Sequence, residues 1–223
     1  MSRPLIVAAL KEELAPLRRK PPIAPATLRV LGDGAPTATD ALVATLDALP
    51  SPPGVVLVAG FCGALDPAFE RGRVVAITRM VAHDRDGVPE PDPNWTARLE
   101  AAGAQIATLS SARGLISGRA ERLALGRLTG AQVVDLESAA LARVCAERSL
   151  PFAVLRVVSD ALDDDLHPHV LAAARADGSV SRAGVIVRTL ATPWEVPSLL
   201  RFARRAATSA RRAADVLVRA IDA

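Results

Sequence analysis

This chain of 223 residues contains no tyrosine, and aromatic residues make up only 3% of it. Its core must therefore be packed mainly with valine, leucine, isoleucine and alanine. The chain has two cysteines, Cys62 and Cys145, too few for a disulfide framework and compatible with a reducing cytoplasm. No apolar run approaches the ~20 residues of a membrane-spanning helix. We therefore expect a cytoplasmic protein with an aliphatic core.

Several common catalytic and targeting motifs are also missing. The chain has no Walker motif and no G-x-S-x-G elbow, and Gly32-Asp33-Gly34 lacks the third glycine of a dinucleotide-binding fingerprint. We expect no metal centre, because no third ligand accompanies the few histidines at a clear spacing. Charged residues follow the first apolar run at once, which predicts an initial strand rather than a signal peptide.

The charge is small but unevenly distributed. The net charge is +3 and the pI is about 9.5, which does not by itself indicate nucleic-acid binding. The C-terminal segment Leu199–Ile221 has apolar residues at helical spacing and arginines over much of the remainder. An amphipathic helix packed on the domain explains this pattern. The alternative is an Arg-rich face that contacts anionic lipid headgroups at the inner membrane.

Strands and helices are predicted to alternate along the chain. Continuous apolar runs such as Leu5–Leu10 and Val55–Ala59 predict strands buried on both faces, and Thr37–Leu49 is typical of an intervening helix. This order predicts βαβ units and a mostly parallel sheet in one α/β domain over residues 1–223. Ligands of such sheets bind beyond the carboxyl ends of the strands.

Three carboxylates follow predicted strands. Glu13 follows the first strand, Glu137 follows a strand that begins at Val133, and Asp160 ends a strand directly after Ser159. Because the ends of parallel strands can lie side by side, we expect Glu137 and Asp160 to face one pocket.

Each of these acids has a chemical and a structural interpretation. Glu137 could hold the two vicinal hydroxyls of a ribose, or could favour a helix start through the macrodipole. Its neighbour Asp135 is a natural N-cap. Asp160 could protonate a departing base if its pocket raises its pKa, or could cap the next segment. Glu13 could orient a water that attacks the sugar, as in inverting glycoside hydrolysis, or could be an exposed helix residue.

Glycine-containing segments follow two further strands. The N–H groups of Gly32 and Gly34 could bind an anion at the start of the next helix. In the segment Gly60–Pro67, glycines such as Gly63 would let the backbone approach a flat ligand, although a tight turn explains them equally well. Cys62 is expected to be a small packed residue.

Four motifs occur in order along the chain: A-L-K-E-E-L (Ala9–Leu14), G-F-C-G-A-L-D-P (Gly60–Pro67), V-V-D-L-E-S-A-A-L-A (Val133–Ala142) and L-R-V-V-S-D (Leu155–Asp160). Their order and spacing resemble the purine nucleoside phosphorylase / methylthioadenosine–S-adenosylhomocysteine nucleosidase superfamily over most of the chain. The resemblance implies a mixed, partly barrel-like central sheet flanked by helices.

The resemblance also implies roles for individual residues. Asp160 matches the acid that contacts the purine, Glu137 the carboxylate that holds the ribose hydroxyls, and Glu13 the acid that positions water in the nucleosidases. Leu136 takes the place of the methionine that usually packs on the sugar. The implied substrate-binding set is Glu137, Leu136, Gly63, Cys62, Phe61 and Ser159, with Gly32 and Gly34 as candidates for an anion site.

Within the superfamily, the chain most resembles bacterial hopanoid-associated phosphorylases, which share the D-L-E-S-A-A segment, the strand before Asp160 and an Arg-rich tail. These enzymes are assigned to the removal of adenine from adenosylhopane, a lipid-like substrate that would give the basic C-terminal helix a purpose. Two departures bear on the nucleophile. Phe61 replaces a hydroxyl residue of many relatives, and no arginine pair occupies the family's phosphate positions.

We therefore expect an enzyme that cleaves the N-glycosidic bond of an adenine nucleoside. It would use no cofactor, and either inorganic phosphate as a co-substrate or water would be the nucleophile. The alternatives are a methylthioadenosine/S-adenosylhomocysteine nucleosidase, a non-catalytic nucleoside-binding module and a membrane-surface scaffold. The expected partner is a small-molecule or lipid-linked nucleoside and not nucleic acid, and the resemblance implies a homo-oligomer.

Overall fold

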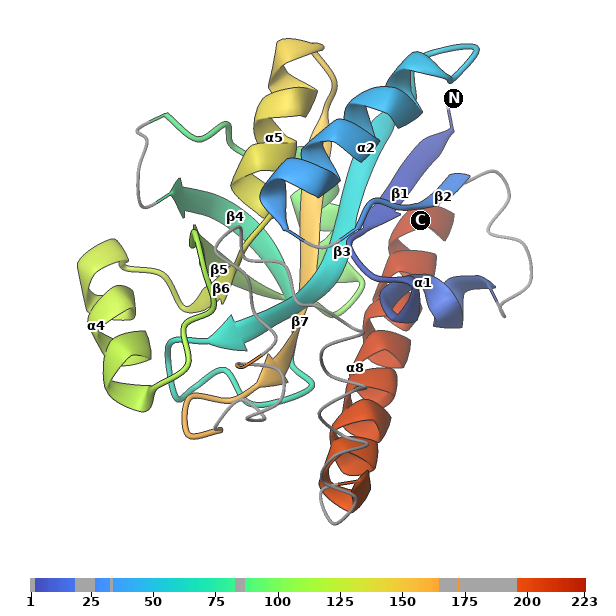
Figure 1. Ribbon diagram of the computed structural model, residues 1–223. Helices are drawn as coiled ribbons and strands as arrows, with labels where there is room; N and C mark the ends of the chain where they lie inside the picture. The colour runs from blue at the N-terminus through green and yellow to red at the C-terminus, as the bar shows by residue number, and fades with distance from the viewer. Residues whose placement is uncertain (1–2, 19–26, 33, 83–86, 165–171, 173–195) are drawn as a thin grey trace.

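The computed structural model describes residues 3–18, 27–32, 34–82, 87–164, 172 and 196–223 (Figure 1). Its elements follow in the order β1 (Pro4–Ala8), α1 (Lys11–Arg18), β2 (Thr27–Val30), α2 (Ala35–Asp47), β3 (Val55–Ala64), β4 (Val74–Ala82), α3 (Pro93–Ala101), β5 (Gln105–Ser111), α4 (Arg119–Thr129), β6 (Val133–Asp135), α5 (Ser138–Glu147), β7 (Phe152–Asp160) and α8 (Val196–Asp222).

The seven described strands form one sheet in the order β2-β1-β3-β6-β5-β4-β7, and β3 also pairs with β7. Because of this extra pairing, β3, β6, β5, β4 and β7 close on themselves. Strands β1, β2, β3 and β7 run parallel, whereas β6 is antiparallel to β3 and β4 is antiparallel to β7. The sheet is therefore mixed and partly closed as a barrel, which confirms the expected fold class.

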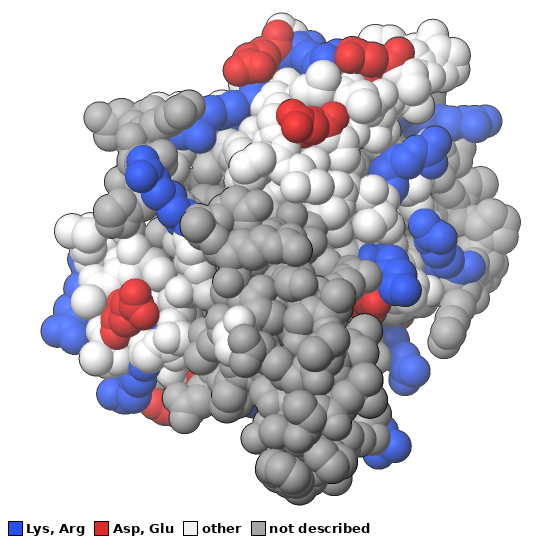
Figure 2. Space-filling view, viewed as in Figure 1, with Lys and Arg blue, Asp and Glu red and all other residues white. Residues whose placement is uncertain are grey.

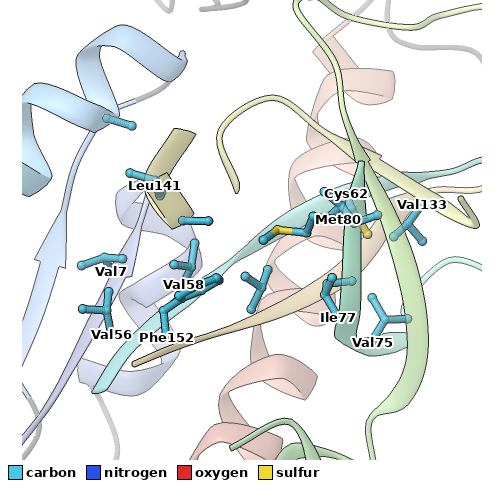
Figure 3. Packing of buried hydrophobic residues seen from close by; sticks show 14 of the residues in the cluster. Val7, Val56, Val58, Cys62, Val75, Ile77, Met80, Val133, Leu141 and Phe152 are labelled. Carbon is cyan, nitrogen blue, oxygen red and sulfur yellow. The ribbon is translucent and has the colours of Figure 1, made fainter. Parts of the chain in front are cut away.

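Both faces of the sheet are buried, as the continuous apolar runs predict. Alternate residues of β3 point to opposite sides: Val56 and Val58 pack with α2 and α5, whereas Leu57 and Ala59 pack with α1 and α8. Figure 3 shows part of the core between the sheet and helices α2 and α5, with Leu141 of α5 near the valines of β1 and β3. In Figure 1, α2 and α5 accordingly lie over one side of the sheet and α8 lies along the other.

Local sequence explains where several helices begin and end. Asp92 caps α3 by accepting the N–H of Trp95 at 2.9 Å, and Pro93 occupies the first helical position, where no N–H is needed. Helix α4 ends at Gly130, whose φ of 68° lies in the left-handed region that glycine adopts readily.

The structure differs from the sequence-based expectation at two strands. The sequence predicts that the third strand ends at Ala59, but β3 continues to Ala64, because its last residues still pair with β7 and then with β6. The sequence also predicts that Glu137 follows a parallel strand. β6 does run parallel to β5, but it is antiparallel to β3, the strand that pairs with β7, so Glu137 and Asp160 do not follow neighbouring parallel strands.

Helix α8 is amphipathic in its described part. Ala213, Ala214 and Leu217 are buried against the sheet, whereas arginines such as Arg204 and Arg211 are exposed. On the face shown in Figure 2, the described basic side chains stand apart from one another and do not form one continuous patch. Among the described residues, no helix combines the length and apolar character required to cross a bilayer.

Leu141→Ala tests the packing that holds α5 against the sheet. Leu141 is 2% exposed, so we expect its truncation to lower the free energy of unfolding by about 2–5 kcal/mol, measured by urea denaturation. Leu128→Ala is the control, because Leu128 is 75% exposed and its truncation should change stability by less than about 0.5 kcal/mol. Equal losses in the two variants would contradict the buried position of Leu141.

Candidate active site

A buried arginine lies at the centre of the candidate site. Arg156 occupies the middle of β7 between the buried Leu155 and Val157, and it is 2% exposed. Its NH2 group forms an ion pair with Asp135 and donates a hydrogen bond of 2.7 Å to Ser138 Oγ. A buried guanidinium without such a partner would be strongly destabilising, so Asp135 is its necessary counter-ion.

Asp135 contacts the first residue of α5 as well as Arg156. Its carboxylate accepts the backbone N–H of Ser138 at 3.3 Å, as an N-cap would at the start of α5. It also accepts hydrogen bonds from Ser138 Oγ at 2.6 Å and Ser111 Oγ at 3.1 Å. The N-cap residue of α5 is Glu137 rather than Asp135, so Asp135 binds the first N–H of the helix from the end of β6, and the same carboxylate fixes Arg156.

Gly60 makes room for this arrangement. It lies opposite Arg156 in the register of β3 and β7. A Cβ atom on Gly60 would lie 2.0 Å from Arg156 NH1 and 2.9 Å from Glu13 Oε1, closer than non-bonded atoms approach. A close approach of charged groups to the backbone, rather than a turn, therefore requires glycine at this position.

Glu13 is buried in the first turn of α1 and held by two backbone groups. Its Oε1 accepts the N–H of Phe61 and its Oε2 accepts the N–H of Leu10, each at 2.8 Å. Burial raises the pKa of Glu13, while the charge of Arg156 and the two N–H donors lower it in part. With 8% of its surface exposed, Glu13 is not the exposed helix residue that the sequence also allowed.

Glu137 immediately precedes α5 and is 9% exposed. Its Oε1 accepts the N–H of Gly34 at 3.1 Å, and its Oε2 accepts no hydrogen bond from a described residue. Burial and the nearby charge of Asp135 raise the pKa of Glu137 to about 7, against the opposing effects of Arg156 and the Gly34 N–H. Near neutral pH, this carboxyl group therefore exchanges between its acid and carboxylate forms.

Asp160, at the end of β7, is held by a second buried arginine. Its Oδ2 lies 2.7 Å from Arg122 NH2, and its Oδ1 accepts a hydrogen bond of 2.5 Å from Ser159 Oγ. Arg122 comes from α4, is 1% exposed, and also donates to the carbonyl of Ala161 at 2.8 Å. Burial raises the pKa of Asp160, although Arg122 and Ser159 oppose that rise. The raised pKa favours the protonated form that a general acid needs.

The end of β3 contacts both Glu13 and the Ser159–Asp160 pair. The N–H of Phe61 binds Glu13, and the carbonyl of Cys62 accepts a hydrogen bond of 3.2 Å from Ser159 Oγ. A Cβ atom on Gly63 would lie 2.8 Å from Asp160 Oδ2, so glycine is needed beside this acid. The structure therefore brings Glu13 and Asp160 to the end of β3, and Glu137 lies close enough to Glu13 for their charges to interact.

The other predicted site residues lie nearby in different environments. The side chain of Cys62 packs in the hydrophobic core, as expected, and burial raises the pKa of its thiol well above the ordinary range. Leu136 is half-buried and packs against a small buried cluster that includes Leu65, Leu125 and Val134.

The predicted anion site at Gly32 and Gly34 is already occupied by protein groups. The N–H of Gly32 donates to the carbonyl of Ala9 at 3.0 Å, and the N–H of Gly34 donates to Glu137. Neither N–H therefore points freely at an anion. Instead, Gly34 positions Glu137.

The histidines His83, His167 and His169 lie outside the described residues. Within the described ranges, no group of three or more histidine, cysteine, aspartate or glutamate side chains could hold a metal ion.

Sequence reasoning missed Arg156 and Arg122. A signal for Arg156 was present, because an arginine within the apolar strand Phe152–Val158 must find a buried counter-ion. Arg122 gave no such signal, since it lies in a helix that contains other charged residues.

Glu137→Gln tests the protonation of this site. Because the pKa of Glu137 is raised from 4.5 to about 7, the folded chain keeps a proton in this interval that the unfolded chain has lost. The contribution of Glu137 to the free energy of unfolding should therefore fall by about 3 kcal/mol as the pH rises from 4.5 to 7. Glutamine mimics the protonated acid, so the variant should match the wild type at the acid end and exceed its stability above pH 7.

Urea denaturation over this pH range measures the effect. Stability curves that stay parallel for wild type and Glu137→Gln at every pH would contradict the raised pKa.

Comparisons with known proteins identify the family and the fold. Residues 20–192 match the Phosphorylase superfamily. The structure is similar to the 5′-methylthioadenosine/S-adenosylhomocysteine nucleosidase of S. pneumoniae, with a TM-score of 0.71, 17% identity and coverage of 99% of each chain. It is also similar to the futalosine hydrolase of Helicobacter pylori, with a TM-score of 0.70, 17% identity and coverage of 99% of this chain and 97% of that one.

A third similar structure is the 5′-methylthioadenosine/S-adenosylhomocysteine nucleosidase of Campylobacter jejuni, with a TM-score of 0.67, 17% identity and coverage of 99% of this chain and 98% of that one. At these identities, the structural likeness shows a common fold. The family match covers most of the chain, and it establishes that this protein is an enzyme that belongs to the phosphorylase superfamily.

Proposed function

We propose that this enzyme hydrolyses the N-glycosidic bond of an adenine nucleoside. The observation that carries the proposal is the placement of Glu13 and Asp160 at the end of β3, with Glu137 close to Glu13. Two carboxyl groups, one for the leaving base and one for the attacking water, are what inverting glycoside hydrolysis requires. The similar structures named as methylthioadenosine/S-adenosylhomocysteine nucleosidases support adenine as the base.

Each carboxyl group has a distinct part in this reaction. Asp160, in its protonated form, donates a proton to N7 of adenine as the bond between C1′ and N9 breaks and its electron pair goes to the base. Glu13, held by two backbone N–H groups, orients a water toward C1′ and accepts its proton. Glu137 uses its free Oε2 to accept a hydrogen bond from a ribose hydroxyl. The products are adenine and the free sugar.

The charge balance supports water over phosphate as the nucleophile. The two arginines that are fully buried in the described chain, Arg156 and Arg122, are each already paired with a carboxylate. A phosphate dianion brought beside the remaining carboxylates would be repelled at close range in a medium of low dielectric constant. The N–H groups of Gly32 and Gly34 offer no compensation, because both are donated within the protein.

Two kinds of 5′ substituent have support. The sequence resemblance to hopanoid-associated phosphorylases and the exposed arginines of α8 favour adenosylhopane, with α8 against anionic lipid. The similar structures favour methylthioadenosine or S-adenosylhomocysteine. A substrate panel should therefore contain all three nucleosides. A homo-oligomeric assembly stays a prediction of the sequence resemblance.

The test of this function is adenine release from that panel, followed by mass spectrometry with and without inorganic phosphate. We expect release without phosphate, and we expect Asp160→Asn to lower kcat by about 10²–10⁴-fold, because it removes the general acid. Asp163→Asn is the matched control, since Asp163 lies in the loop that follows Asp160 but is largely exposed and pairs with Arg119 at the surface.

A strict requirement for phosphate would assign phosphorolysis instead. Nucleoside binding without release would indicate a binding module, and normal turnover by Asp160→Asn would remove Asp160 from the mechanism.

Arg122→Gln tests how the protonation of Asp160 is controlled. The positive charge of Arg122 lowers the pKa of Asp160 against the effect of burial, so its loss should raise that pKa further. The alkaline limb of the kcat/KM profile should therefore move to higher pH, because Asp160 stays protonated up to a higher pH. Arg122→Lys keeps the charge and should show a smaller displacement. Identical pH profiles for all three proteins, with folding verified by thermal unfolding, would contradict this role.

A further inference from the structure

A hollow of about 440 Å³ lies between α8 and the places where β4 and β5 begin. It is formed by the turn before β4, the start of β5 and one side of α8. None of Glu13, Glu137 and Asp160 lines it, and the proposed hydrolysis does not use it. Its volume is within the range of small-ligand sites, ~300–1,000 Å³.

The lining of this hollow is basic. Four arginines against two acids leave it a net charge of +2, and these residues are Arg71, Arg73, Arg212, Arg219, Glu70 and Asp215. The arginines come from two segments that are far apart in the sequence, the turn before β4 and the helix α8. The fold therefore gathers a positive charge that neither segment carries alone, and an anion is the ligand that it favours.

Backbone carbonyls hold two of these guanidinium groups in place. Arg212 NH1 donates to the carbonyl of Gly72 at 3.2 Å, and Arg219 donates twice to the carbonyl of Ala102, at 2.9 and 2.7 Å. Gly72 has a φ of 82°, and a Cβ atom on it would lie 2.4 Å from Arg212 NH1, so glycine permits this contact. Each group keeps further N–H donors, and little side-chain freedom is left to lose on binding.

Arg73 differs from its neighbours because it is uncommitted. It is exposed, and its side chain forms no hydrogen bond or ion pair with any described residue. By contrast, Arg71 is ion-paired with Asp164. Arg73 can therefore turn toward a ligand without breaking a contact with the described part of the chain.

We propose that this hollow binds the phosphate group of a small anion. Planar guanidinium forks bind phosphate oxygens through paired hydrogen bonds, and a net charge of +2 complements a phosphate dianion. The same chemistry is offered by a soluble phosphate compound and by the phosphate of a lipid headgroup.

Calorimetric titration of the full chain with inorganic pyrophosphate at low salt tests the proposal. The wild type should show saturable binding, and Arg73→Gln should weaken it about tenfold through the loss of a charge-assisted contact. Arg127→Gln is the matched control, because Arg127 is exposed on α4, away from the hollow, and the substitution removes the same charge. Binding to this control should equal that of the wild type. Neither substitution should change adenine release, so this test does not depend on the proposed hydrolysis.

Sedimentation with vesicles of phosphatidylcholine and phosphatidylglycerol separates the two sources of phosphate. Vesicle binding that Arg73→Gln weakens identifies a lipid headgroup. Pyrophosphate binding with no vesicle binding, or with vesicle binding that Arg73→Gln leaves unchanged, identifies a soluble compound. The proposal is overturned if pyrophosphate shows no saturable binding, or if the Arg73 and Arg127 variants weaken it equally.

Discussion

The buried ion pair between Arg156 and Asp135 is the interaction on which the candidate site depends. It joins the middle of β7 to the last residue of β6, and it therefore sets the position of Glu137, which lies between β6 and α5. It also explains Gly60, where any side chain would collide with the guanidinium. Removal of Arg156 would leave the buried carboxylate of Asp135 without its counter-ion, at a cost of about 3–5 kcal/mol.

One guanidinium does not neutralise the carboxyl groups around it. Burial opposes the charge of Arg156, but Asp135, Glu137 and Glu13 outweigh this effect and raise the pKa of the guanidinium above its ordinary value. Burial raises the pKa of both Glu13 and Glu137, and for Glu137 the charges of Asp135 and Glu13 add to that rise. A site organised to hold ribose and water therefore destabilises the fold near neutral pH, where the carboxylate form of Glu137 has to exist in the interior.

The sequence was sufficient to predict the carboxylates, because each follows a strand whose apolar run is a local signal. It could not reveal that β6 runs antiparallel to β3, since strand pairing depends on contacts between distant segments. The ion pairs of Arg156 and Arg122 were missed for the same reason, because each arginine finds its acid in another element. The positive-φ glycines Gly32 and Gly34 were correctly placed after a strand, but the partners of their N–H groups depend on the tertiary fold.

The loop after β7 is held by two contacts of different strength, one with Arg122 and one with Asp164. The carbonyl of Ala161 accepts a hydrogen bond from Arg122, and its N–H donates to Asp164 at 2.6 Å, which in turn pairs with Arg71 beside the hollow. The side chains of Arg71 and Asp164 are 30% and 28% exposed, so their ion pair contributes at most about 1 kcal/mol. Arg122 is fully buried and pairs directly with Asp160. The geometry of the acid is therefore fixed mainly by α4, and an anion that draws Arg71 away would disturb the loop more than it disturbs Asp160.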